Sequence, residues 1–295
     1  MNYQKILKKS IDLHVHIGPE IIPRKFNLVE LVNYEKDKLA GIAVKNHFFP
    51  TIAMNQINSI TKPFIINSVV LNRYVGGFNP DIIRASAELS DKPIIVWFPT
   101  LHTKKFLDEQ KFEIPREWIG GEQITRPNLT KNIKPLNILN KKGSVSNEVK
   151  NVLQTIKDYN AILATGHLSW SESLKLVEFA TQKIGIKKVI ITHPIYQKIK
   201  MPINIQNKLV KAGALIEHCY SMYSIDKIAI KKIVNQIKIV GAKNCILSSD
   251  VGQIFSESPS EALVNFMSLL EKNGLTEGEI KVMLIDNPNK LLFKN

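Results

Sequence analysis

Cysteine is scarce in this sequence. Only two cysteines, Cys219 and Cys245, occur among the 295 residues. A disulfide framework needs several paired thiols and a four-cysteine zinc site needs four, so both kinds of structure are excluded. The scarcity agrees with a reducing compartment, and we interpret both cysteines as packing residues.

Long apolar runs are also missing. No stretch of about 18 apolar residues, the length that a membrane span needs, occurs anywhere in the sequence. The first residues carry charge and lead into no apolar segment of the kind that a secretory signal contains. We therefore expect a soluble cytoplasmic protein that has no membrane partner.

Acidic residues are fewer than basic ones. There are 26 Asp and Glu against 40 Lys and Arg, which gives a net charge of +14. Such a balance can indicate nucleic-acid binding, but only five of the basic residues are arginine and the lysines are scattered. We interpret the charge as a solvated surface that helps to gather a small, anionic substrate, and nucleic acid is the less favoured partner.

The chain alternates short apolar segments with amphipathic ones. The apolar segments predict eight strands, over residues 11–17, 42–44, 64–70, 94–98, 161–164, 188–191, 214–216 and 245–247. A predicted helix follows nearly every strand, and four of the helices open with a capping-box pattern at Asn27, Ser169, Ser258 and Thr276. Buried strands that alternate with helices are typical of a parallel sheet covered on both faces.

Eight strand-helix units in about 290 residues predict a closed (β/α)8 TIM barrel, with residues 1–295 as a single domain. The alternative is an open, doubly wound sheet, which normally carries a glycine-rich phosphate loop after its first strand. Periodicity fails over residues 102–146, after strand 4, and this stretch is too long for an ordinary loop. We predict an insertion there, with a small hairpin at 135–143 and a lid at 118–121. It either closes over the barrel mouth or contacts another subunit of a homo-oligomer.

The histidines follow the predicted strands. His14 and His16 lie one residue apart, and because side chains alternate along a strand, both imidazoles can reach one metal ion while Val15 points the other way. The other histidines each follow a later strand by a few residues: His47, His102, His167, His193 and His218. Since the carboxyl ends of the strands meet at one mouth of a barrel, we expect these side chains to line one pocket with Lys45 and Asp250.

Neutral imidazoles and carboxylates are ligands of a divalent metal of the zinc type, which can keep one position open to water. Such a metal lowers the pKa of its water toward ~7, so that metal-bound hydroxide can attack a carbonyl or phosphoryl centre. Asp250 is the candidate for the group that takes or relays the proton.

The segment Asp12-Leu13-His14-Val15-His16, followed by strand-terminal His167 and His193 and by the late Asp250, resembles the amidohydrolase superfamily of metal-dependent hydrolases. The closing segment 285–292, with its Asn287-Pro288 pair, is similar to the segment that often ends such barrels. The resemblance covers nearly the whole chain. It implies one or two divalent metal ions, with zinc favoured over Mn, Fe or Ni.

Position by position, the resemblance implies that His14 and His16 hold the first metal together with Asp250, which also shuttles protons. It implies that His167 and His193 hold a second metal or support the first. Many members of the superfamily add a carboxylated lysine or a glutamate at the fourth strand, but here that strand ends in Phe98-Pro99-Thr100.

The fourth-strand ligand has a candidate substitute in Lys45, at the end of strand 2. Lys45 either becomes carboxylated and bridges two metals, or binds substrate as a cation. Four further residues are interpreted as substrate contacts: His47, Thr100, His102 and His218. His218 follows Glu217, and because adjacent strand residues face opposite ways, only one of these two can point inward.

We predict a metal-dependent hydrolase with a small-molecule substrate. One alternative is a TatD-type phosphoesterase or nuclease, which the positive charge favours. The other is a barrel that has lost its bridging ligand and serves as a non-catalytic binding protein.

Overall fold

The computed structural model describes residues 1–55, 62–108 and 133–293, and its strands are short and buried at the centre. The strands are β1 (Ile11–His16), β2 (Gly41–Lys45), β3 (Phe64–Ile66), β4 (Ser68–Val70), β5 (Ile95–Trp97), β6 (Ile162–Ala164), β7 (Val189–Ile191), β8 (Leu215–Cys219) and β9 (Cys245–Ser248). The helices are α1 (Tyr3–Leu7), α2 (Leu28–Glu35), α3 (Pro80–Glu88), α4 (Lys104–Asp108), α5 (Asn147–Asp158), α6 (Trp170–Phe179), α7 (Ile203–Lys211), α8 (Ser221–Ser224), α9 (Ile230–Val240), α10 (Pro259–Lys272), α11 (Glu277–Lys281) and α12 (Asn287–Phe293).

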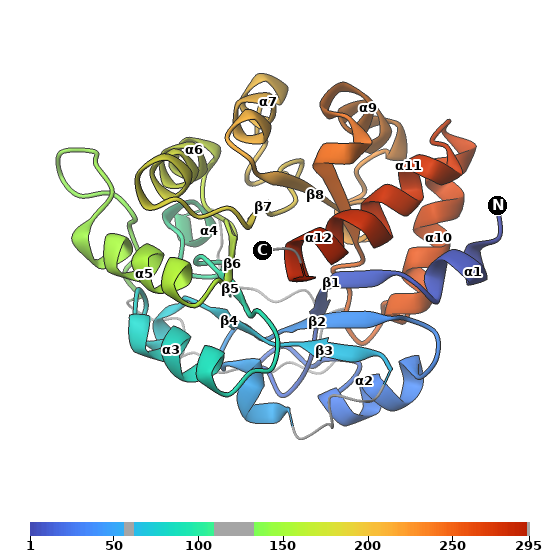
Figure 1. The fold of residues 1–295 in the computed structure, drawn as a ribbon, viewed down its shortest axis with the longest axis horizontal. Helices are drawn as coiled ribbons and strands as arrows, with labels where there is room; N and C mark the ends of the chain where they lie inside the picture. Colours follow the sequence, from blue (N-terminus) through green and yellow to red (C-terminus); the bar gives the residue numbers. More distant parts are fainter. Residues whose placement is uncertain (56–61, 109–132, 294–295) are drawn as a thin grey trace.

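The strands pair in parallel and follow one another in chain order. β1, β2 and β3 form one sheet, and β4 to β9 form a second. β3 and β4 together occupy the predicted strand at 64–70, which is interrupted at Asn67. All eight predicted strands are therefore confirmed, with the third one split. Figure 1 shows the strands at the centre, surrounded by helices that include α2, α3, α5, α6, α7 and α9.

The first strand meets the chain that follows the last one. The backbone N–H of Asp250 donates to the carbonyl oxygen of His14 at 2.8 Å, and the N–H of His16 donates to the carbonyl oxygen of Val251 at 2.8 Å. The carboxylate of Asp12 also accepts from the N–H of Ser249 at 3.0 Å. We call this set of contacts the β1–β9 junction, and it brings the two ends of the strand series together.

The predicted helix starts are confirmed. Asn27, Ser169, Ser258 and Thr276 each accept from the backbone three residues on, and the glutamate at that position bonds back to the cap. The helix predicted over 28–39 ends earlier, at Glu35. The backbone leaves the helical conformation there, because Lys36 has a ψ of 127° and Asp37 has a φ of 60°.

The interior that the strands surround is lined by an apolar cluster. Its cluster consists of Ile11, Leu13, Ala43, Ile66, Val70, Ile95, Trp97, Ile162, Ala164, Ile190 and Ile246, joined by Leu291 and Leu292 of α12. The ring of Phe293 also lies 5.8 Å from that of Phe64, the first residue of β3. Helix α12, which the sequence pattern did not predict, therefore covers the amino end and leaves the carboxyl end for polar groups.

The predicted insertion after the fourth strand is partly described. It contains α4 and, near the hairpin predicted at 135–143, a single antiparallel bridge between Leu139 and Val145. The predicted lid at 118–121 lies outside the described residues. Among the helices of the described ranges, none has both the length and the hydropathy needed to span a membrane.

Asn287 ties α12 to the start of β9. Its buried Nδ2 donates to the carbonyl oxygens of Cys245, Lys243 and Ala242 at 2.6, 3.2 and 3.3 Å. We predict that Asn287→Ala lowers the free energy of unfolding in urea by about 1–3 kcal/mol, because these carbonyls lose a buried donor. Asn289→Ala, which removes only a bond to Ile285 within the helical segment, is the matched control. Equal losses in the two variants would contradict this role of Asn287.

Candidate metal centre

A bulge in β1 directs both of its histidines inward. The pairing of β1 with β2 gains one residue in β1 just before Val15. Leu13 belongs to the interior cluster, and the next residue, His14, also faces the interior, where its ring lies 4.5 Å from that of Trp97. Val15 packs in the outer apolar layer, and His16 returns to the interior side. One extra residue thus changes which side chains face the mouth.

Asp250 lies at the centre of the polar groups. Its Oδ1 is 3.1 Å from Nε2 of His14 and 3.0 Å from Nε2 of His16, and its Oδ2 accepts from the hydroxyl of Ser221 at 2.7 Å. The ligand atoms of His14, His16 and Asp250 all lie within 4.8 Å of one another. The backbone of Asp250 has a φ of 51°, a left-handed conformation that is unusual for a residue other than glycine.

The ends of β6 and β7 bring two further imidazoles to the same place. His193 Nε2 lies 4.0 Å from Asp250 Oδ2, and its ring centroid is 5.9 Å from that of His14. The ring of His167 lies 5.2 Å from that of His193. His167 follows Gly166, whose φ is 59° and where a Cβ would lie 2.1 Å from a carbonyl oxygen, so only glycine fits this turn.

Lys45, from the end of β2, completes the group. Its Nζ lies 2.9 Å from Nε2 of His14 and 4.3 Å from the centroid of the Trp97 ring. The side chain is buried, and burial lowers the pKa of Lys45 below its ordinary value. Trp97 ends β5, which is the fourth predicted strand. Its indole ring faces the lysine amine at the strand end where the resemblance predicts a metal ligand.

Burial sets the charges of these groups. It lowers the pKa of His193 to about 4, and it holds the pKa values of His16 and His167 well below the ordinary range. Burial alone would raise the pKa of Asp250, but His14 and His16 outweigh it and hold that pKa well below its ordinary value. Near neutral pH the imidazoles of His16, His167 and His193 are therefore neutral and the carboxylate of Asp250 is ionised, which are the forms in which these groups bind metals.

The ligand atoms of the cluster fit a bound cation. Lys45 can only donate, so its contact makes Nε2 of His14 an acceptor, and that nitrogen also faces the acceptor oxygen Oδ1 of Asp250. Two acceptors 3.1 Å apart repel each other unless a positive group lies beside both. In the described structure the Lys45 amine contacts the His14 nitrogen, and a divalent metal ion would satisfy both acceptors.

Two other predicted residues lie beside the cluster as a pair. The ring of His47 is 4.7 Å from that of His16, and its Nδ1 lies 2.9 Å from the hydroxyl of Thr100. The backbone N–H of His47 donates to Glu20, which also forms an ion pair with Arg24. His47 and Thr100 thus lie where a molecule bound at the cluster could contact them.

The last two predicted residues lie apart from the metal cluster. His102 is buried against the ring of Tyr74, and its Nδ1 accepts from the backbone N–H of Arg73 at 3.2 Å. On β8, Glu217 contacts His14, so alternation turns His218 to the opposite face of the strand. Neither nitrogen of the His218 ring has a hydrogen-bond partner among the described residues.

The sequence analysis did not assign roles to two residues that contact the cluster. Glu217 lies 3.2 Å from Nδ1 of His14, and Ser221 donates to Asp250. A signal for Glu217 was present, since a carboxylate inside an otherwise apolar strand points to a buried partner. Ser221 begins a short helix after β8 and carries no such signal.

Comparisons with known proteins concern the fold and the family of this chain. The family of unknown function DUF6282 matches residues 9–217. Among solved structures, a probable dipeptidase, PvdM, from Pseudomonas aeruginosa is 11% identical with a TM-score of 0.62, covering 98% of this chain and 96% of that one. An amidohydrolase from Pseudomonas aeruginosa is 10% identical with a TM-score of 0.53, covering 99% of this chain and 98% of that one. A TatD homologue, YJJV, from Escherichia coli K12 is 12% identical with a TM-score of 0.53, covering 97% and 98%.

At these identities the likeness shows the fold alone. The predicted α/β class is confirmed, and the fold is similar to those of an amidohydrolase and a TatD homologue. No curated protein matches the chain.

The β1–β9 junction leaves no space for a side chain at Gly252. This residue has a φ of 147°, and a Cβ there would lie 2.3 Å from the carbonyl oxygen of His16. We predict that Gly252→Ala lowers the free energy of unfolding by about 1–3 kcal/mol more than Gly213→Ala does. Gly213 has a φ of 94° but no atom within 4 Å of its Cβ position, so this control carries backbone strain alone. Matching thermal or urea unfolding curves for the two variants would contradict the prediction.

Proposed function

We propose that this chain, which belongs to the family of unknown function DUF6282, is a metal-dependent hydrolase that cleaves a small molecule at a carbonyl or phosphoryl centre. The observation that carries the proposal is the meeting of His14, His16 and Asp250 within 4.8 Å, with His193 beside them. His16 and Asp250 come from strand ends that are 234 positions apart in the sequence. Apolar packing alone gives no reason to bury so many polar groups together.

The ligands follow from the contacts. His14, His16 and Asp250 would hold the first ion, while His167 and His193 would hold a second or support the first. Imidazoles together with a carboxylate suit zinc better than magnesium or calcium, which prefer oxygen ligands. When bound, a divalent ion of this kind lowers the pKa of water and polarises the bond to be cleaved.

Asp250 has the position and charge of a proton acceptor. Its ionised carboxylate accepts one hydrogen bond from Ser221 at Oδ2 and keeps Oδ1 toward the histidines. The same carboxylate can take the proton that the attacking water gives up and pass it to the leaving group. His193 lies 4.0 Å from Oδ2, on the side where such a transfer would take place.

Lys45 is our candidate for the bridging ligand that the fourth strand does not provide. As an ammonium group, Nζ lies 2.9 Å from the nitrogen of His14 that would bind the metal, so cation and metal would compete there. Carboxylation removes this conflict: the neutral amine bonds to the carbon of carbon dioxide, one proton leaves, and the product is an anionic ligand. His47 and Thr100 remain as proposed substrate contacts at the edge of the cluster. The same role for His102 and His218, which lie apart from the cluster, stays a prediction.

Metal content tests the proposed function. We predict that protein purified without chelator carries about one or two transition-metal ions per chain, and that Asp250→Asn loses most of this metal and its activity. Hydrolytic activity is measured on a panel of lactones, amides, phosphoesters and carboxylates. Metal below about a tenth of an ion per chain would instead support the non-catalytic binding barrel.

The net charge of +14 favours one second candidate, a TatD-type nuclease. A random oligonucleotide is added to the substrate panel. Metal-dependent cleavage of this oligonucleotide, with a rate that falls steeply as salt is added, would select the nuclease.

Carboxylation of Lys45 has a direct test. With ¹³C-bicarbonate, we predict a carbamate carbon signal in the NMR spectrum of the wild-type protein and its absence in Lys45→Ala. We also predict that Lys45→Ala holds about one ion fewer than wild type, because a bridging ligand is lost. Wild-type protein that binds its full metal without a carbamate signal would contradict the bridge and leave Lys45 as a cation for substrate binding.

A further inference from the structure

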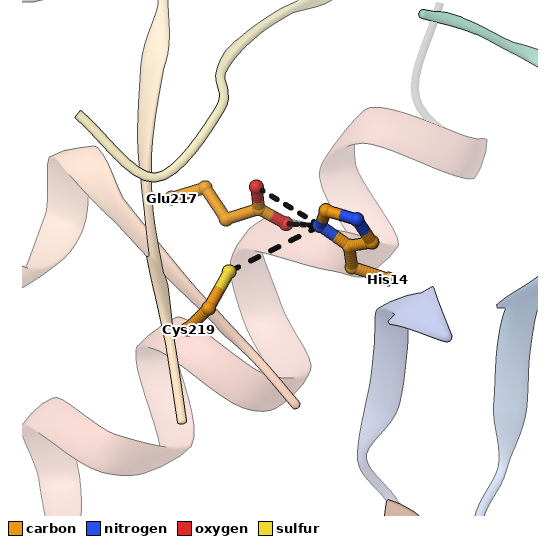
Figure 2. Close-up of side chains that lie close together, drawn as sticks. All are labelled: His14, Glu217 and Cys219. Carbon is orange, nitrogen blue, oxygen red and sulfur yellow. Dashed lines mark hydrogen bonds and ion pairs between the residues drawn. The ribbon is translucent and has the colours of Figure 1, made fainter. Parts of the chain in front are cut away.

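His14 lies between two sets of polar atoms. Its Nε2 faces Asp250 and Lys45, as described above. Its Nδ1 faces β8, where Oε1 and Oε2 of Glu217 lie at 3.2 and 3.3 Å and Sγ of Cys219 lies at 4.0 Å (Figure 2). All three side chains are fully buried, so water does not compete for these contacts.

The chemistry of the contacts assigns the proton on the ring. An ionised carboxylate can only accept, so the contact with Glu217 requires a hydrogen on Nδ1 of His14. The contact with Lys45 requires an acceptor at Nε2, because a lysine amine donates. Lys45 on β2 and Glu217 on β8 thus select the same form of the ring, with hydrogen on Nδ1 and a lone pair on Nε2. The acceptor oxygen Oδ1 of Asp250, 3.1 Å from Nε2, fits this form when a cation lies beside both atoms.

We propose that Glu217 is a positioning residue for the metal centre, which fixes His14 in the orientation and tautomer that present the Nε2 lone pair to the metal. This inference rests on the proposed function. Metal-binding histidines commonly donate their second N–H to a carboxylate, which fixes the ring and raises its basicity. Glu217 makes this contact with both oxygens at similar distances, and within the described part of the chain its carboxylate has no other hydrogen-bond partner.

The same three residues could instead hold an ion of their own, because their ligand atoms lie within 4.8 Å of one another. A metal between Glu217 and Nδ1 would need that nitrogen unprotonated, while Nε2 already acts as the acceptor for Lys45. His14 would then carry no ring hydrogen and would be an anion, which burial opposes. The contacts therefore favour the positioning role.

The test compares zinc affinity among wild type, Glu217→Gln and Glu35→Gln, measured by competition with a chelator after removal of resident metal. Glu35 is the matched control, a fully buried carboxylate on α2 that accepts from the backbone of Ser260, away from the histidines. We expect Glu217→Gln to bind zinc about 10–100-fold more weakly than wild type, and Glu35→Gln to bind as wild type does. With Co²⁺ in place of zinc, the visible absorption spectrum should change in Glu217→Gln alone.

The outcomes separate this inference from the proposed function. Wild-type protein that binds neither zinc nor Co²⁺ would overturn both. Wild-type protein that binds zinc, with an equal affinity in Glu217→Gln or an equal loss in Glu35→Gln, would overturn the positioning role only. If Glu217→Gln fails to fold, ¹⁵N NMR of metal-free wild type decides: hydrogen on Nδ1 of His14 supports the proposal, and hydrogen on Nε2 overturns it.

Discussion

The candidate site depends on the contact between the first strand and the chain that follows the last one. Asp12 provides much of this contact, since one carboxylate oxygen accepts from the backbone N–H groups of both His14 and Ser249. The N–H of Asp250 then donates to the carbonyl oxygen of His14. The backbones that carry the two principal ligands are thus bonded to each other, and their side chains meet at 3.1 Å as a consequence.

The interior of the strand ring holds apolar side chains at one end and polar, titratable side chains at the other. At the amino end, α12 and the apolar cluster exclude water and stabilise the fold. At the carboxyl end, buried imidazoles, Lys45 and Asp250 lie in the same low-dielectric environment at a cost in free energy of folding. The two left-handed residues at strand ends, His193 and Asp250, belong to this second half, as is common at functional sites. Stability and proposed function therefore come from opposite ends of one barrel.

Much of this arrangement was predictable from the sequence because it follows local rules. The capping boxes mark where α2, α6, α10 and α11 begin, and short apolar runs mark the strands. Strand ends in a parallel barrel converge, so the approach of His193 to His14 followed from topology. Other features depend on tertiary contacts that no local pattern contains. The bulge before Val15 and the reach of Lys45 over Trp97 are of this kind, as is the pairing of Glu217 with His14.

X-ray absorption spectroscopy at the edge of the bound metal tests the central claim most directly, because it reports the atoms around the ion. The account predicts a shell of nitrogen and oxygen at about 2.0–2.1 Å, with the multiple scattering of several imidazoles and no sulfur. A sulfur contribution near 2.3 Å would place the metal at Cys219 instead, beside Glu217. That result would contradict a centre built on His16 and Asp250.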